Sequence, residues 1–258
     1  MTERGQDEKE PGMSIGATVN KHIQELGGGF MFSREARTYA AETGIDEFFG
    51  PYTRGRGGVL GEVDADVVTA AFGFFPGHSI RAAWESVTLP AEKAAQRYAL
   101  ACQEFGRRKL GAFEDAERLA TLLETVAAAA DPAGAPLFAG WRAMPLPTDP
   151  AARVMQLAHV LRELRGGLHL MAVRASGITP LQAVLVSGSP LNDGPGQARW
   201  YGWPEPFEEI TADIRDRWQQ AESITDTLIA PAFAVLGDTD AADLVRLTTA
   251  AHAATFTR

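Results

Sequence analysis

The chain contains 258 residues, and 45% of them are hydrophobic, which is enough to bury a large core as one helical domain or as two that share an interface. Its formal net charge of −9, from 24 basic and 33 acidic residues, gives no overall attraction to nucleic acid or to an anionic membrane. The single cysteine, Cys102, excludes an internal disulfide and any two-cysteine metal or redox site. Because no stretch has the apolar length of a signal peptide or a membrane span, we expect a cytoplasmic protein with no membrane partner.

The first 130 residues contain a polar tail and then several segments with helical periodicity. We expect residues 1–13 to be disordered and residues 14–130 to form an N-terminal helical domain. Ser33 and Asp64 each precede a periodic segment and are suited to cap a helix. Residues 54–58, Arg-Gly-Arg-Gly-Gly, lie between these caps, and we predict a glycine-rich loop there.

The predicted glycine-rich loop carries two arginines. Arg54 and Arg56 alternate with glycines, and guanidinium groups on such a loop suit a carboxylate, sulfate or phosphate group. We therefore predict that both arginines bind an anionic part of a substrate, with Tyr52 and Trp84 as further substrate contacts. A solvent-exposed loop with no ligand is the alternative.

A helix predicted after Pro76 has a polar face that offers acid–base groups. His78 lies on this face with Glu85, opposite an apolar face that includes Trp84. His78 is a candidate proton acceptor, and Glu47 and Glu85 are candidate carboxylates for moving a proton. Polar residues at this spacing are more often the solvated side of a surface helix.

The middle of the chain is predicted to contain a long helical segment and a connector. Apolar residues keep helical spacing over 90–130. Residues 131–150 then contain five prolines, so we predict an extended connector over 131–148. A C-terminal helical domain, residues 149–258, is expected after it.

The C-terminal domain begins with a helix that carries an unusual arginine. Asp149 and Pro150 are suited to start a helix, which we predict to continue through Gly166 and Gly167. Arg165 then falls on the buried face and must meet either a carboxylate or an anionic ligand, because burial of an unpaired charge is costly. His169, one turn later, is a candidate catalytic residue, whereas His159 is expected to be solvated on the opposite face.

A shorter helix from Pro180, after the Ser176-Gly177 break, completes the shape of a helix-turn-helix. The following segment, 188–206, has four prolines and four glycines, so we predict a loop with neither helix nor strand there. Its aromatic residues suit a functional lid. With Arg199 as its only basic residue, it offers neither a recognition helix nor phosphate contacts for DNA. Further helices are predicted over 205–235 and 239–256.

Four short motifs occur in order over nearly the whole chain. They consist of Phe32, Ser33, Glu35, Ala36 and Arg37; Gly55 and Arg56; Val63, Asp66, Val67 and Val68; and Leu161, Arg162, Glu163, Arg165, Gly166 and His169. Together they resemble a family of mostly actinobacterial helix-turn-helix proteins of this length and of unknown function. The resemblance implies an all-α multi-helix bundle, here with a degenerate helix-turn-helix in its C-terminal half and without the recognition helix and wing.

Sequence motifs for nucleotide, flavin, zinc or serine-hydrolase chemistry are not found, so we predict no cofactor and no metal. Two functions remain. The first is a cofactor-independent tailoring enzyme or ligand-binding protein for a small molecule with an anionic group, in natural-product biosynthesis, acting by displacement, cyclisation or elimination. The alternative is a ligand-responsive transcriptional regulator that binds DNA. Whether the chain forms a homo- or hetero-oligomer through its helical faces stays open.

Overall fold

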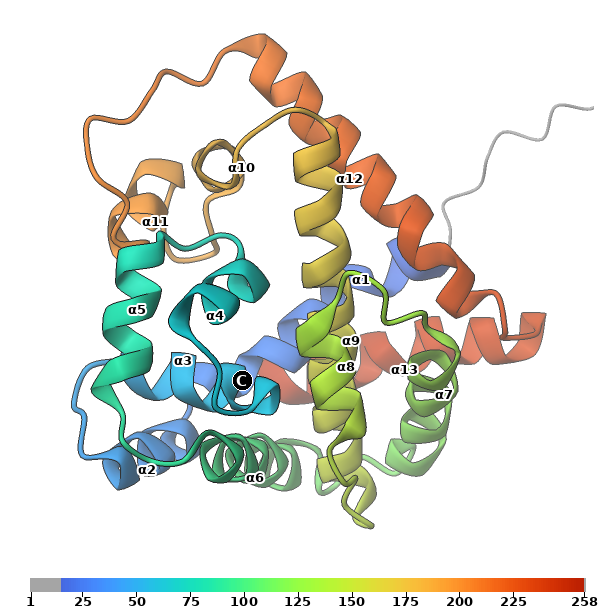
Figure 1. Cartoon of the computed structure of the whole chain (residues 1–258). Helices are drawn as coiled ribbons and strands as arrows, with labels where there is room; N and C mark the ends of the chain where they lie inside the picture. Colours follow the sequence, from blue (N-terminus) through green and yellow to red (C-terminus); the bar gives the residue numbers. More distant parts are fainter. Residues whose placement is uncertain (1–14, 258) are drawn as a thin grey trace, which may run out of the picture.

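The computed structural model describes residues 15–257 and places them in helices, with no strand in that range (Figure 1). The predicted all-α fold is confirmed, while the predicted disordered tail lies outside the described residues. The α-helices are α1 (Ile15–Gly28), α2 (Arg34–Thr43), α3 (Phe49–Gly57), α4 (Ala65–Phe72), α5 (Gly77–Ser86), α6 (Ala91–Leu110), α7 (Ala116–Ala129), α8 (Pro136–Ala143), α9 (Pro150–Ala175), α10 (Pro180–Ser187), α11 (Gly194–Tyr201), α12 (Ala212–Phe233) and α13 (Asp238–Phe256). Two 3-10 helices, η1 (Gly29–Phe32) and η2 (Gly58–Leu60), extend α1 and α3.

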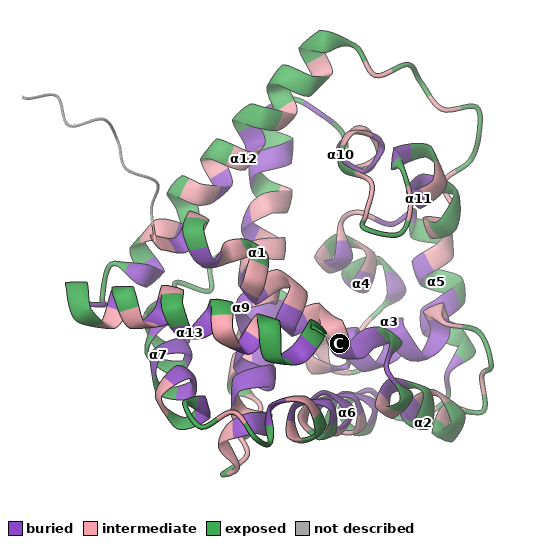
Figure 2. Ribbon diagram, turned by 180° about the vertical axis from the view of Figure 1, so that it is seen from behind, coloured by how far each residue is buried: buried purple, intermediate pink, exposed green. Residues whose placement is uncertain are grey.

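Helix α9 is the centre of the fold. It begins as predicted, with the Asp149 side chain accepting a hydrogen bond from the Ala151 amide, and it continues through Gly166 and Gly167. Helices α1, α6, α7, α8 and α12 all pack against it, and Figure 2 shows buried residues along α9 where α1 crosses it. Two neighbours come close because they present glycines: a Cβ at Gly27 would lie 2.5 Å from the Ala158 carbonyl oxygen, and one at Gly106 would lie 2.6 Å from that of Ala151. The backbones of α1 and α6 therefore lie directly against α9.

Three predictions of irregular structure are wrong. The segment 54–58 belongs to α3 and η2, and both arginines in it are buried. The connector 131–148 contains α8, and the predicted loop 188–206 contains α11. In both short helices a proline occupies the first turn, where the missing amide hydrogen costs nothing. The helical segment over 90–130 is in turn divided into α6 and α7, and α12 begins later than predicted, at Ala212.

One apolar core crosses the predicted connector. It includes Leu123 on α7, Leu161 on α9 and Leu244 on α13, so residues on both sides of 131–148 share one interior. His159 belongs to this interior: it is fully buried, and the prediction that it is solvated is wrong. Helix α9 has no solvated side at that level because other helices surround it.

The helix-turn-helix shape is present at the C-terminal end of α9. Helices α9 and α10 meet at 110°, and Thr179 and Gln182 form a capping box at the start of α10. Helix α11 follows as a third helix, and an extended segment then leads to α12, which crosses the outside of α9 (Figure 1). Within residues 15–257 no single helix is long and apolar enough to cross a membrane; α9 and α10 taken together across their bend meet that test by length and composition.

Candidate functional site

Two neighbouring cavities lie between α3, α9 and α11. We call them the aromatic cavity, of about 600 Å³, and the polar cavity, of about 280 Å³. Both have residues from α3, α9 and α11 in their walls. The residues common to both walls are Tyr52, Phe75, Arg162, Gln197 and Tyr201. The shared wall makes them two compartments of one candidate site.

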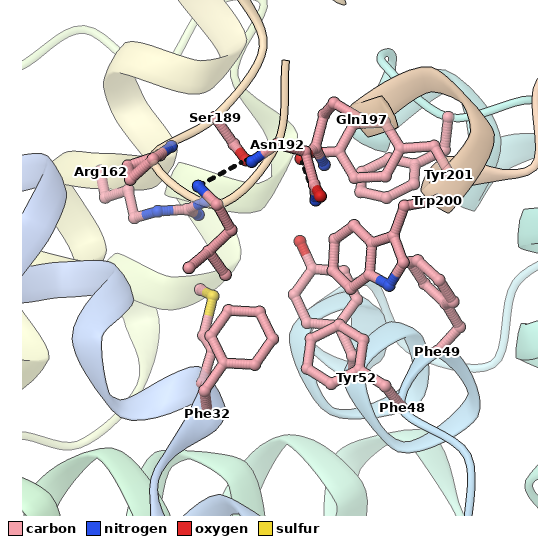
Figure 3. Close-up of a pocket in the computed structure, with 14 residues that line it drawn as sticks. Phe32, Phe48, Phe49, Tyr52, Arg162, Ser189, Asn192, Gln197, Trp200 and Tyr201 are labelled. Carbon is pink, nitrogen blue, oxygen red and sulfur yellow. Dashed lines mark hydrogen bonds between the residues drawn. The ribbon is translucent and has the colours of Figure 1, made fainter. Parts of the chain in front are cut away.

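The aromatic cavity is built from rings that come from distant parts of the chain (Figure 3). Its aromatic lining residues are Phe32, Phe48, Phe49, Tyr52, Phe75, Trp200 and Tyr201. The rings pack on one another: the Phe49 and Trp200 centroids are 4.8 Å apart, and those of Phe75 and Tyr201 are 4.1 Å apart. Arg162 contributes the only charged side chain in this wall. Such a cavity accepts a flat or branched apolar group.

A buried charge cluster lies behind the shared wall. Arg56 donates to both carboxylate oxygens of Glu163, at 2.9 and 2.7 Å, and Arg162 donates to one of the same oxygens at 2.9 Å. Burial alone would raise the pKa of Glu163, but the charges and hydrogen bonds of the two arginines hold it at about 2. The carboxylate is therefore ionised, and two guanidinium groups share its single negative charge.

Arg56 also positions Tyr52. Its second terminal nitrogen donates to the Tyr52 hydroxyl oxygen at 3.0 Å, and its guanidinium lies over the ring of Phe72. Because Tyr52 accepts this hydrogen bond, its own O–H hydrogen is free to donate to another group. Tyr52 lines both cavities, so a ligand in either one has a hydrogen-bond donor in reach.

A second polar group occupies the far end of the polar cavity. Arg165 donates to Oε2 of Glu222 at 2.5 Å. For Arg165 the sequence left two partners open, a carboxylate or an anionic ligand, and this ion pair is the first of them. The two side chains are partly exposed to the cavity, at 14% and 28%. His169 lies beside them, stacked on Phe74, and burial together with the charge of Arg165 lowers its pKa to about 4. It is thus a neutral imidazole near pH 7.

The structure brings Tyr52, Arg56, Arg165 and His169 together in the polar cavity, but places the other predicted site residues elsewhere. Arg54 bonds to the Leu89 carbonyl and to Glu62 and lies over the ring of Trp84, so these residues hold the junction between α5 and α6.

The three predicted acid–base residues outside the cavities have other surroundings. His78 and Glu85 are on the exposed side of α5. This agrees with the alternative that the polar face is the solvated side of a surface helix. Glu47 caps α3 through the amides of Phe49 and Gly50. Among the rings of the aromatic cavity, the sequence predicted Tyr52 as a substrate contact and placed Trp200 and Tyr201 in a lid. It assigned no site role to Arg162 or to the other rings.

The third helix of the helix-turn-helix is turned toward the cavities. In three-helix variants of this motif that bind DNA, the third helix enters the major groove with polar side chains. Here Gln197, Trp200 and Tyr201 of α11 line the cavities instead, and the exposed Arg199 pairs with Glu205 at 3.0 Å. The fold and the site together define an all-helical protein in which a helix-turn-helix corner borders two adjoining cavities.

Comparison with known proteins places the chain in a family. A family model described as "Helix-turn-helix family" matches residues 17–258, so the chain belongs to that family. No curated protein and no solved structure is detectably similar to it.

Proposed function

We propose that this protein binds a small molecule with an apolar body and an anionic group, as a ligand-binding protein or as a cofactor-independent tailoring enzyme in natural-product biosynthesis. The apolar body occupies the aromatic cavity, and the anionic group pairs with Arg162 at the shared wall. The positions proposed for the apolar body and for the anionic group both follow from the side chains that line the two cavities.

The charge of Arg162 is the observation that carries this proposal. Arg56 already makes a bidentate pair with Glu163, so the group of Arg56, Arg162 and Glu163 keeps one positive charge. Arg56 is buried, whereas 26% of the Arg162 side chain is exposed, and both cavities reach it. A partly buried arginine with an incompletely neutralised charge is a favourable partner for a carboxylate, sulfate or phosphate.

The polar cavity also offers groups for proton transfer. Tyr52 has a hydroxyl hydrogen to donate, and His169 is a neutral imidazole. A neutral base and a hydrogen-bond donor beside a held anionic group are the parts that a displacement, cyclisation or elimination needs, since the anionic group can leave while a proton is taken up nearby.

Replacing Arg162 by methionine is expected to weaken the binding of naphthylpropionate, an apolar ring with a carboxylate, by about tenfold or more. The reason is the loss of a charge-assisted hydrogen bond, worth roughly 1.5–3 kcal/mol. Titration calorimetry measures this effect. The neutral amide of the same probe should bind weakly to the parent and be insensitive to the change. Arg199→Met, an exposed arginine on α11, is the matched control and should bind the carboxylate like the parent. Equal affinity of the Arg162→Met variant and the parent would show that Arg162 does not hold the anion.

The alternative function, a ligand-responsive DNA-binding regulator, is favoured by membership of a helix-turn-helix family. Against it stand the inward turn of α11 and the pairing of its arginine. We expect no sequence-specific binding to the DNA that flanks the gene, measured by gel shift at moderate salt. A saturable, salt-sensitive shift that persists with competitor DNA would favour the regulator over the enzyme.

A further inference from the structure

Two hydrogen-bond acceptors face each other in the polar cavity. Nε2 of His169 and Oε1 of Glu222 are 3.6 Å apart, and both residues line the cavity wall. The other carboxylate oxygen of Glu222 is already used by Arg165. What lies between Nε2 and Oε1 depends on which imidazole nitrogen carries the hydrogen.

Thr225 fixes the hydrogen of His169 on Nδ1. The Thr225 hydroxyl donates its single hydrogen to the Ala221 carbonyl at 2.7 Å, within α12, and Thr225 is fully buried. Its oxygen can therefore only accept from His169 Nδ1, 2.9 Å away. Because the imidazole is neutral, Nε2 presents a lone pair toward the carboxylate oxygen. Two acceptors in this position repel each other unless a donor stands between them.

The charges around the acceptors also favour a cation. Glu222 and Asp226 lie one turn apart on α12, and Arg165 interacts with both. Burial raises the pKa of Asp226, the Arg165 charge lowers it, and the Glu222 carboxylate raises it. With both carboxylates ionised, the group of Arg165, Glu222 and Asp226 has one negative charge, since His169 is neutral. Asp226 does not line the cavity, so the negative charge that a ligand meets there is that of Glu222, whose Oε1 is not used by Arg165. The group around Arg162 has one positive charge and forms the positive end of the cavity.

We infer that the negative end is a subsite for a primary ammonium group, which donates to His169 Nε2 and Glu222 Oε1. This rests on the proposed function, because the same molecule places its anionic group on Arg162. The ligand then carries both a negative and a positive charge. It is an amino acid or an amino-acid derivative with an apolar or aromatic side chain. Such a molecule matches the opposite charges of the two ends and fills the aromatic cavity with its side chain.

Pairs of probes that differ only in the amine test this subsite. Naphthylalanine is compared with naphthylpropionate, and glycyl-naphthylalanine with its acetyl counterpart, so that two separations of amine and carboxylate are covered. At least one amine is expected to bind about tenfold more tightly than its partner, from one charge-assisted contact. The gain should disappear in Glu222→Gln and shrink in His169→Phe, which keeps the stacking on Phe74. Glu208→Gln, an exposed carboxylate near α10, is the control and should keep the gain.

The outcomes separate the two proposals. If naphthylpropionate fails to bind through Arg162, the proposed function is wrong. If it binds but neither amine adds affinity, only the ammonium subsite is wrong. A gain that survives Glu222→Gln would likewise place the ammonium elsewhere. Binding of naphthylpropionate should be unchanged or tighter in Glu222→Gln, because Arg165 is then released, and this shows that the variant remains folded.

Discussion

Glu163→Gln is expected to lower the free energy of unfolding by about 3–5 kcal/mol, because it leaves buried guanidinium charge without its carboxylate. Glu163 is 1% exposed and accepts hydrogen bonds from both Arg56 and Arg162. The amide of glutamine keeps the shape of the side chain but removes the negative charge that both arginines share. Urea denaturation monitored by circular dichroism measures the change.

Two further variants show whether this loss comes from the buried charge. Glu104→Gln removes an exposed partner of Arg107 on α6 and should cost no more than about 1 kcal/mol. The double variant Arg56→Met/Glu163→Met removes the bidentate pair and should be more stable than Glu163→Gln alone. If Glu163→Gln is as mild as Glu104→Gln, the cluster does not contribute to folding in this way.

The same cluster corrects the role predicted for Arg56. The sequence predicted an arginine on a glycine-rich loop that binds an anionic part of a substrate. In the structure the Arg56 guanidinium is buried against Glu163, so its removal is expected to destabilise the protein first. Arg162, which shares that carboxylate and faces the cavities, is the arginine that a ligand can reach.

Helices with a clear cap and a regular apolar face were predictable from the sequence. Helix α9 was predicted from Asp149 onward because a capping side chain, a proline in the first turn and helical spacing all agree. The helical structure of segment 54–58 was not predictable, because its glycines allow close packing and do not make the backbone flexible. A Cβ at Gly55 would lie 2.6 Å from the Tyr98 ring, and one at Gly58 would meet the Ala91 carbonyl. Only the tertiary contacts reveal which of these two roles a glycine has.

Proline content misled the prediction in the same way. Pro136 and Pro195 lie in the first turns of α8 and α11, and Asp193 caps α11 through the Gly196 amide. A helix of eight residues carries too little periodicity to outweigh a count of prolines and glycines around it. The aromatic wall formed by α11 was hidden for this reason.

The candidate site was only partly predictable because its key charge balance depends on distant residues. Arg162 follows Leu161 in a motif noted in the sequence, yet its positive charge matters only because Arg56, 107 residues from Glu163, already occupies that carboxylate. One local signal was available: Arg162, Arg165 and His169 have the spacing of one helix face. A polar stripe on a helix that is otherwise apolar indicates a cavity or a buried network.

Acidification from pH 6.5 toward pH 4 is expected to destabilise the protein through its buried histidines. His159 is fully buried; its Nδ1 lies 3.1 Å from the Gly27 carbonyl oxygen, and Nε2 has no hydrogen-bond partner among the described residues. Burial is the main cause that lowers its pKa to about 4; Glu163 raises it, and Arg162 and Arg56 lower it. The unfolded chain takes up this proton near pH 6.5, whereas the folded protein resists until about pH 4.

The sign and size of the effect follow from this difference in proton uptake. The stabilisation is fully present above pH 6.5 and is lost as the pH falls toward 4, by at most about 1.4 kcal/mol per pH unit for each histidine. His169, with its pKa also lowered to about 4, acts in the same direction. Glu163, with its pKa lowered to about 2, adds a loss of stability in the same direction only below about pH 5.

The free energy of unfolding, measured by urea denaturation between pH 7.5 and pH 5, tests this expectation. The parent should lose stability over this range, and His159→Phe should show a clearly smaller slope, whatever its own packing cost at pH 7.5. His78→Gln, an exposed histidine on α5, should keep the slope of the parent. Parallel curves for His159→Phe and the parent would mean that His159 takes up its proton equally in the folded and unfolded states. Water would then reach the imidazole, and the core around α9 would be less closed than its packing indicates.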